Sequence, residues 1–269
     1  MNDRASRYGT RELAVLSLIT PLLAGMVASG CSSMRYRTPG RGVAVTSLAT
    51  SDFDIEERML RQPAASFPAR VAVVRVQASG YRSHGSISYG HGKYSVVTAG
   101  DMERDEHFER LEQLPMVADV ARLNRLLIPP KLESDKELRL AAASLKADLL
   151  FVYTVDTIFR VDEHDVGPLR LITLGLLPIN EAHVTSIVSA ALFDVRTGYV
   201  YSVAESSARE TQLANAWTSK DAIDSARRRA ERRAFEGLLD EFTLAWADVV
   251  AEYAGQTDEP VVSKLGDAR

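Results

Sequence analysis

Cys31 has the most distinctive chemistry in the sequence, because it is the single cysteine of the 269-residue chain. One thiol cannot form a disulfide within the chain, and it is too little for a cysteine metal site. The residues before it favour acylation instead. A weakly basic start (1–12) precedes an apolar, uncharged stretch (13–27) and then the small residues 28–30. This order of regions is typical of a secretory signal whose cleavage site lies just before the cysteine.

A core helix or a membrane-spanning helix is the alternative interpretation of the apolar stretch. A bilayer span needs roughly 20 apolar residues, whereas the stretch 13–27 is shorter and is interrupted by Pro21. We therefore expect residues 1–30 to be a signal peptide that is removed from the mature protein.

The same segment resembles the signal of bacterial lipoproteins, in which a short motif ends in a small residue followed by the cysteine that is lipidated. Gly30 and Cys31 match these two positions, and Ala28 stands where leucine is commoner. The resemblance implies cleavage between Gly30 and Cys31 and a membrane attachment through acyl chains on Cys31. Ser32 stands where lipoproteins retained in the inner membrane typically have aspartate. The expected location is therefore the outer membrane, with the domain facing the periplasm.

Two histidines, His84 and His91, are the next candidates for chemistry, and they lie in a stretch rich in glycine and serine. A metal would need further ligands, and no carboxylate or cysteine at a matching spacing supplies them. No serine lies in a nucleophile-elbow pattern, and the glycines lack the strand–helix context of a phosphate-binding loop. We therefore expect no metal, no cofactor and no enzymatic activity, although a catalytic triad assembled from distant residues stays open.

The segment 79–94 that holds these histidines has the composition of a binding loop. Tyrosines offer large contact area with little conformational entropy to lose, and glycine and serine let a loop adapt. Long loops in compact domains are more often functional or disordered than structural. The candidate partner-binding residues are Tyr81, His84, Tyr89, His91 and Tyr94. We expect a loop or a mobile hairpin here, and replacement of residues 81–92 by a short linker should leave stability nearly unchanged. A disordered stretch without a partner is the alternative.

Two further segments are weaker candidates for contacts. The leucine-rich stretch 169–180 would mark a partner or membrane contact if it is exposed, and a segment packed on the core is the favoured alternative. The arginine cluster 226–233 could meet anionic lipids or an acidic partner. However, Arg227 and Glu231 lie at the i,i+4 spacing of a solvated helix, which is the favoured interpretation.

The composition of the chain limits the classes of protein to which it can belong. The net charge of −4 at pH 7 argues against a nucleic-acid partner, which favours a basic domain. Hydrophobic residues make up 46% of the chain, enough for one domain with a substantial core. We expect a signal peptide at 1–30, a tether at 31–66, one domain at 67–253 and a disordered tail at 254–269.

Periodicity predicts the elements of that domain. Nearly continuous apolar runs indicate buried central strands, and Ser134 with Glu137 forms a capping box at the start of a helix. The stretch 117–130 is ambiguous between strand and helix. The predicted elements are strands at 69–77 and 148–156, short helices at 52–62, 105–114 and from 134, a hairpin of 183–193 and 199–207 around Gly198, and a long amphipathic helix at about 219–253. The predicted fold class is α/β or α+β, with a mixed or largely antiparallel sheet packed by helices.

Across residues 69–252 the order of these elements resembles the α/β lipoprotein domains of the LpoB, CsgG and TolB N-terminal type. It is most similar to the rhombotarget lipoproteins, and the matching stretches are "ADLLFVYTVD" (147–156) and "LGLLPINEAHVTSIVSAALFDVRTG" (174–198). The resemblance implies a non-catalytic envelope lipoprotein that binds a protein partner as an accessory or regulator of an envelope assembly. The alternative is a subunit of a CsgG-like oligomeric secretion channel, in which 79–98 or 157–183 would rearrange into membrane hairpins. Those stretches lack the sustained alternation that membrane strands require.

Overall fold

In the computed structural model, strand β1 (Ala69–Ala78) lies inside a mixed seven-stranded sheet. Six of the strands follow the order β2 (Ile87–Tyr89), β4 (Tyr94–Ala99), β1, β7 (Leu149–Glu163), β8 (Asn180–Asp194) and β9 (Val200–Ala214), and β5 (Val117–Arg122) also pairs with β1. The valines of β1 are buried on both faces of the sheet, as the nearly continuous apolar run predicts. Strand β7 (Leu149–Glu163) pairs with β1 in parallel, from Val71 opposite Leu149 to Arg75 opposite Tyr153. The two predicted central strands are thereby confirmed as neighbours.

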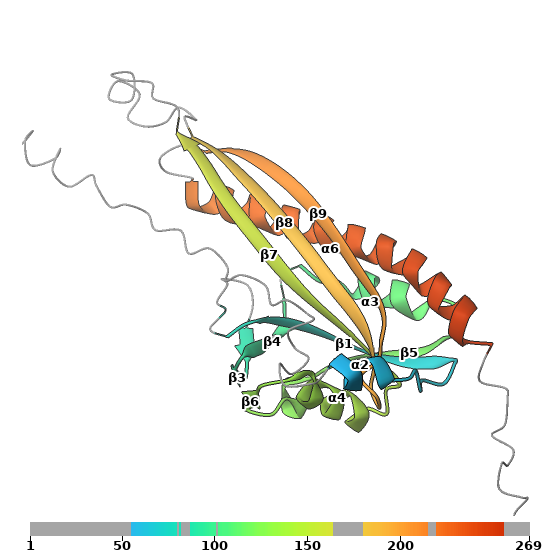
Figure 1. Cartoon of the computed structure of the whole chain (residues 1–269). Helices are drawn as coiled ribbons and strands as arrows, with labels where there is room; N and C mark the ends of the chain where they lie inside the picture. The colour runs from blue at the N-terminus through green and yellow to red at the C-terminus, as the bar shows by residue number, and fades with distance from the viewer. Residues whose placement is uncertain are drawn as a thin grey trace, which may run out of the picture. The chain divides into compact units, whose positions relative to one another are not determined.

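The structure describes residues 55–79, 81, 87–100, 102–163, 180–214 and 219–255, all of which belong to one compact unit within residues 37–269. Helices pack on both faces of the sheet, and a long helix closes the chain (Figure 1). The predicted α+β class with a mixed sheet is therefore confirmed. The predicted signal peptide, the tether up to residue 54 and the tail from residue 256 lie outside the described residues.

Three long strands form the other side of the sheet. Strands β7, β8 (Asn180–Asp194) and β9 (Val200–Ala214) are each 15 residues long and pair as an antiparallel meander. The β8–β9 turn contains Gly198 with φ of 71°, a left-handed conformation that favours glycine. The predicted hairpin is confirmed, and both of its strands extend beyond the predicted ends.

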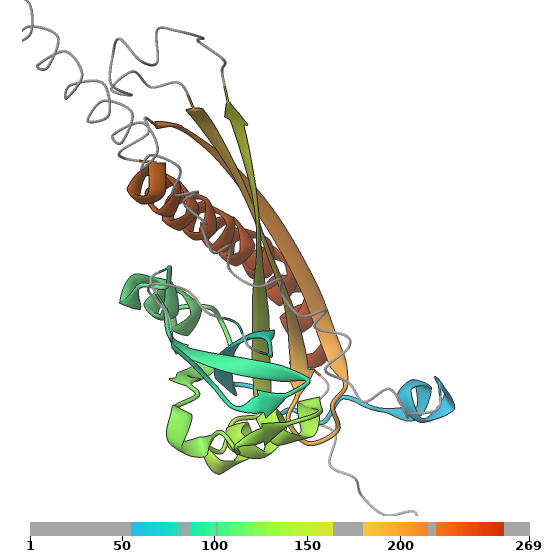
Figure 2. The ribbon, with the colours of Figure 1, turned by 90° about the vertical axis from the view of Figure 1, so that its left-hand side faces the viewer.

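Helix α6 (Ser219–Tyr253) runs along one face of these three strands, as both ribbon views show (Figures 1 and 2). Its predicted apolar stripe is buried against the sheet, because the i, i+3, i+4 spacing keeps the stripe on one side of the helix. Fully buried members of the stripe are Phe235, Leu238, Leu239, Phe242, Trp246 and Val249.

Helix α4 (Asp135–Ser144) packs on the opposite face, beside the beginning of β7. The predicted capping box is present: the Ser134 backbone N–H donates to Glu137 Oε2 at 2.9 Å, and Ser134 Oγ accepts from the Lys136 N–H at 3.3 Å. Leu138, Ala141 and Ala142 fill the space under α4. Because α4 is short, it covers only the base of the sheet and leaves the same face of the long strands without a helix.

The remaining elements are short. They are α2 (Ile55–Leu60), β2 (Ile87–Tyr89), β3 (His91–Gly92), β4 (Tyr94–Ala99), α3 (Asp105–Glu112), β5 (Val117–Arg122), the 3-10 turn η2 (Arg125–Leu127) and β6 (Lys131–Leu132). The ambiguous stretch 117–130 is thus a strand followed by a 3-10 turn. Strands β3 and β6 form a separate two-stranded sheet.

In the arginine cluster 226–233, Arg228 and Arg233 are exposed, as the interpretation of a solvated helix face predicts, whereas Arg227 corrects that interpretation. Arg227 and Glu231 are 1% and 0% exposed, and their side chains form an ion pair of 2.6 Å under the sheet. Glu231 also accepts a hydrogen bond from Thr157 Oγ1 of β7 at 3.0 Å. The i,i+4 pair exists as predicted, but it holds α6 to the strands and does not face solvent.

The burial of the α6 stripe yields the first prediction. Trp246 is 1% exposed, and its indole N–H donates to the Pro115 carbonyl at 2.8 Å. We expect Trp246→Ala to lower the free energy of unfolding by about 3–5 kcal/mol, because a large cavity replaces the ring. Chemical denaturation measures the change. The matched control is Leu244→Ala on the exposed side of α6, expected within about 0.5 kcal/mol of the parent, and an equal effect of the two substitutions would contradict the packing.

Candidate functional site

The edge of β1 that does not face β7 is shared by two strands. Strand β5 pairs in parallel with its first half, from Ala69 to Val73, and β4 pairs antiparallel with its second half, from Arg75 to Ala78. The connection from β4 through α3 to β5 leaves the sheet at this junction. Crevices form where the neighbours of a strand diverge in this way, and such places are common ligand sites in α/β sheets.

A cavity of about 280 Å³ lies at this junction. Polar and apolar groups contribute about equally to its walls. The side chains of Arg75, Glu103, Arg122 and Tyr153 supply its charges and hydroxyl. The other lining residues are Val73, Val74, Val97, Thr98, Gly100, Phe108 and Leu123.

Arg75 is the central polar residue of the cavity. It is 2% exposed and interrupts the apolar run from Val71 to Val76 of β1. One guanidinium nitrogen, Nη1, lies 3.3 Å from Glu103 Oε1, and Nη2 donates to the Tyr81 hydroxyl at 3.1 Å. The Tyr153 hydroxyl donates to the same Glu103 oxygen at 2.9 Å. The cavity therefore contains a buried ion pair between Arg75 and Glu103, and the hydroxyls of Tyr81 and Tyr153 form hydrogen bonds to it.

The ion pair is incompletely satisfied. Arg75 Nε and Glu103 Oε2 are buried, and neither has a hydrogen-bond partner among the described residues. Gln77, two residues further along β1, is fully buried, and neither polar atom of its amide has a partner there. A buried polar group without a partner costs about 1–3 kcal/mol. Several buried hydrogen-bonding groups in this region therefore have no partner among the described residues.

Electrostatics keep the Arg75 guanidinium and the Tyr153 phenol protonated. Burial lowers the pKa of Arg75, but Glu103 together with Tyr81, Glu231 and Tyr153 outweighs burial and raises the pKa above the ordinary value. Burial raises the pKa of the Tyr153 hydroxyl, and the Glu103 carboxylate raises it further. Tyr153 therefore keeps its proton near neutral pH and serves as a donor to Glu103.

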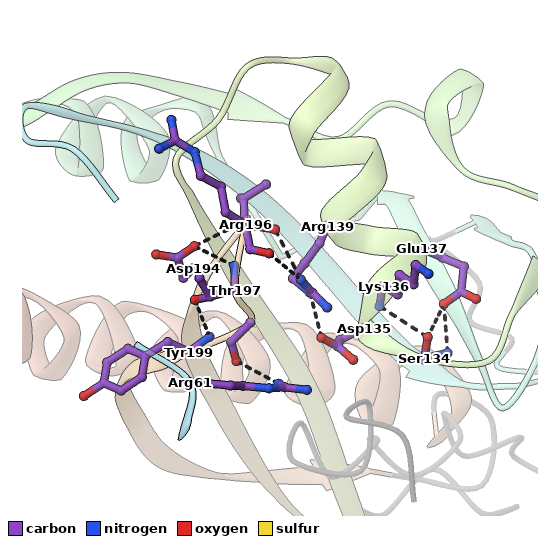
Figure 3. A network of polar contacts seen from close by, with 12 residues as sticks. Arg61, Ser134, Asp135, Lys136, Glu137, Arg139, Asp194, Arg196, Thr197 and Tyr199 are labelled. Atoms are coloured by element: carbon purple, nitrogen blue, oxygen red, sulfur yellow. Dashed lines mark hydrogen bonds and ion pairs between the residues drawn. The ribbon is translucent and has the colours of Figure 1, made fainter. Parts of the chain in front are cut away.

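A second polar network surrounds the β8–β9 turn and differs in being satisfied. Asp194 is fully buried and accepts from the backbone N–H groups of Arg196, Thr197 and Ala64 at 2.8, 2.9 and 2.6 Å. Arg61 donates to the Gly198 carbonyl at 3.2 Å, and Arg139 reaches the Val195 and Arg196 carbonyls at 3.3 Å (Figure 3). These contacts join residues 61–64, the turn and α4, so we assign the network a structural role.

The sequence-predicted partner-binding residues are not brought together on one surface. Tyr94 is fully buried and donates to the Ser134 carbonyl, and Tyr81 is 3% exposed against Arg75. Tyr89 is half-buried and His91 is exposed, on β2 and β3. The prediction of an exposed binding loop is therefore wrong for Tyr81 and Tyr94, whose rings lie in the protein interior.

The same finding corrects the expectation that residues 81–92 are dispensable for stability. Strand β2 pairs with β4, β3 pairs with β6, and the Tyr81 hydroxyl bonds to a buried arginine. Cys31, Gly30, His84 and the apolar stretch 169–180 lie outside the described residues, so their roles stay predictions.

The sequence analysis missed the cavity residues, although one signal was present. "ARVAVVRVQ" places a charged side chain inside a strand that is otherwise buried on both faces. A buried arginine requires a partner, so Arg75 could have been singled out. The identity of Glu103 could not be read from the sequence, because other acidic residues such as Asp105 and Glu106 lie close to it in the chain.

Comparisons with known proteins give a distant likeness in structure. No family model and no curated protein sequence matches the chain. A DUF330 protein from Xanthomonas campestris is similar with a TM-score of 0.32 and 15% identity, covering 73% of this chain and 94% of that one. A candidate lipoprotein from Caulobacter crescentus CB15 has a TM-score of 0.24 and 17% identity over 46% and 86% of the two chains. A hypothetical protein from Chlamydia trachomatis has a TM-score of 0.25 and 14% identity over 71% and 98%. Likeness at this level carries no argument about function, and the resemblance to rhombotarget lipoproteins stays a prediction.

The buried ion pair generates the second prediction. We expect Glu103→Gln to lower the free energy of unfolding by about 3–5 kcal/mol, because it leaves the Arg75 charge buried without its carboxylate. Denaturant unfolding followed by circular dichroism measures the loss. Glu106→Gln, an exposed position on α3, is the control and should unfold like the parent. A Glu103 variant as stable as the control would mean that the carboxylate does not balance Arg75.

Proposed function

We propose that this protein is a lipid-anchored envelope protein that binds a protein partner and has no catalytic role. The observation that carries the proposal is the face of strands β7, β8 and β9 opposite α6. Beyond α4, the side chains of this face are not covered by any helix among the described residues. We call the uncovered part of this surface the open face. It consists of Asp156, Ile158, Arg160, His183, Thr185, Ile187, Ser189, Val203, Glu205, Ser207, Arg209 and Thr211.

The open face has the properties of a surface that meets another protein. Ile158 and Val203 are 62% and 64% exposed on it, although β-branched apolar side chains in strands are normally half-buried. Serine and threonine side chains surround them, as in an interface whose rim is polar. The regular, three-strand surface is wide enough for an extended segment or a helix of a partner.

A hollow of about 430 Å³ on the open face supports an acidic partner segment. Its lining consists of Ile158, Arg160, His183, Thr185 and Arg209. Two arginines and one histidine surround a single apolar side chain, and none of the described residues that line the hollow carries a carboxylate. Complementary charge at an interface steers association and rejects wrong partners.

Attachment to the membrane rests on the sequence around Cys31. In the described part of the chain, no helix is long and apolar enough to cross a membrane. The chain that follows Cys31 joins the domain at Arg61, Ala64 and Ala65, which bond to the β8–β9 turn and to Tyr201 of β9. A tether held at the turn would leave the open face beyond α4 accessible to a partner.

The second candidate function, a subunit of an oligomeric secretion channel, predicts a different partner. In that case the surface of the long strands would meet further copies of the same chain. The crosslinking experiment below distinguishes the two functions by the mass of its products.

The lipid anchor gives the third prediction. We expect Cys31→Ala to abolish labelling by a palmitate analogue and to leave the signal uncleaved, because the acylated thiol is absent. Labelling in growing cells, followed by gel electrophoresis of the captured protein, measures both effects. Ser33→Ala is the control and should be labelled like the parent. Equal labelling of Cys31→Ala and the parent would refute the anchor.

The open face gives the fourth prediction. A photo-crosslinking amino acid placed at Ile158 or Val203 of the full-length lipoprotein should form adducts in cells. The same group at Leu244, equally exposed on the outer side of α6, should not. We expect Arg209→Glu to reduce the Ile158 adduct at least fivefold if the partner segment is acidic.

The mass of the adduct decides between the two candidate functions. A heterologous adduct supports a separate protein partner, whereas adducts only between copies of this chain favour the channel subunit. Equal adducts at Ile158 and Leu244, or none at the open face, would place the binding surface elsewhere.

A further inference from the structure

We propose that the cavity beside Arg75 binds a small zwitterion, a molecule of amino-acid size with a carboxylate and a protonated amine. This inference goes beyond the proposed function and does not depend on it, because the cavity and the open face lie on different parts of the sheet. It rests on three properties of the cavity: its size, its unsaturated polar groups and its balanced charge.

The size of the cavity limits the ligand. Its volume of about 280 Å³ lies just below the usual range of small-molecule sites, roughly 300–1,000 Å³. A nucleotide or a lipid chain is too large for such a space, whereas a molecule of five to ten heavy atoms fits.

The positive side of the cavity suits a carboxylate. Arg75 Nε is a buried donor without a partner among the described residues, and Arg75 lines the cavity. Arg122 lines the same space, and its guanidinium lies 4.6 Å from the centre of the Phe108 ring, which restricts its position. Guanidinium groups bind carboxylates with short, charge-assisted hydrogen bonds.

The negative side of the cavity suits a donor group on the same ligand. Glu103 uses Oε1 for Arg75 and Tyr153, which leaves Oε2 buried and without a partner among the described residues. A Cβ built on Gly100 would overlap Glu103 Oε2, so this oxygen lies directly beside the glycine that lines the cavity. An ammonium group offers three donors for such an oxygen.

The charge of the site distinguishes a zwitterion from a simple anion. Arg75 is paired with Glu103, and Arg122 is paired with Asp105 at 3.1 Å. Each of these two cations therefore already has its own carboxylate, and the net charge of these four described side chains is zero. A bound acetate would add an uncompensated charge to a partly desolvated site, which is unfavourable. A zwitterion adds no net charge and places one group at each side.

The apolar walls accommodate an aliphatic side chain. Val73, Val97 and Leu123 line the cavity between the charged groups. The plain alternative is that water molecules alone satisfy Arg75 Nε and Glu103 Oε2, as buried waters commonly do for polar groups. The experiment below treats that alternative as a result that overturns the proposal.

Isothermal titration calorimetry on the full-length lipoprotein in detergent micelles tests the inference. The probes are L-alanine, L-serine, propionate and ethylamine. We expect L-alanine or L-serine to bind with a Kd at least tenfold lower than propionate or ethylamine.

Two variants connect the binding to the cavity. Gly100→Ala places a methyl group against Glu103 Oε2, and Arg122→Gln removes an exposed guanidinium, so neither change removes core packing. We expect each to raise the Kd of the best zwitterion at least tenfold. Arg125→Gln, in η2 and outside the cavity lining, should change the Kd less than twofold. Circular dichroism of each variant confirms that it is folded.

Three results would overturn the proposal. Absence of binding by every zwitterion would mean that water alone fills the cavity. Equal binding of propionate would mean that the ligand class is wrong. Binding that Gly100→Ala and Arg122→Gln leave unchanged would place the ligand at another site. None of these results bears on the crosslinking of the open face, so the two proposals fail separately.

Discussion

The structure depends on one constraint: because β1 is buried, the positive charge of the Arg75 guanidinium must be paired with a negative charge. An uncompensated charge in a protein interior costs several kcal/mol. Three residues outside β1 surround the Arg75 guanidinium. Glu103 before α3 supplies the negative charge, Tyr81 after the end of β1 accepts a hydrogen bond from Arg75, and Tyr153 of β7 donates one to Glu103. Satisfying the arginine therefore fixes the junction at which β4 and β5 share one edge of β1. The same junction leaves a cavity because the two strands diverge there. Stability and a candidate binding site thus have a common origin.

The length mismatch between the two helices that cover the sheet divides the domain into two regions. Helix α6 has 35 residues and accompanies the long strands, whereas α4 has 10 residues and covers the opposite face at the base only. At the base, apolar side chains fill both sides of the sheet. Further along, the α6 side is closed by packing and by the Arg227–Glu231 pair. The other side presents Ile158 and Val203 to solvent. The base therefore supplies the cavity, and the long strands supply an accessible surface.

Sequence patterns predicted the elements well where burial follows periodicity. The valine run of β1, the capping box at Ser134 and the stripe around Trp246 each identified their element, because each reflects local geometry. The patterns failed where tertiary contacts decide the outcome. Tyr81 and Tyr94 lie in a stretch with the composition of an exposed loop, but both rings are buried. The Tyr81 hydroxyl bonds to the buried Arg75, and the Tyr94 hydroxyl bonds to the Ser134 carbonyl. The i,i+4 spacing of Arg227 and Glu231 is typical of a helix surface, and only the position of the strands packed against α6 shows that Arg227 is buried. The Arg75–Glu103 pair joins residues 28 positions apart, so sequence spacing could not reveal it.

A double-mutant cycle on Arg75 and Glu103 tests the central claim most directly. The free energies of unfolding of Arg75→Met, Glu103→Gln and the double variant are compared with that of the parent. If the two charges balance each other in the interior, either single change leaves a buried group uncompensated, and removing both relieves that penalty. We predict that the double variant is more stable than the sum of the single effects by at least about 1.5 kcal/mol. Effects that add to within about 0.5 kcal/mol would show that the two side chains do not depend on each other, and this account of the junction would be wrong.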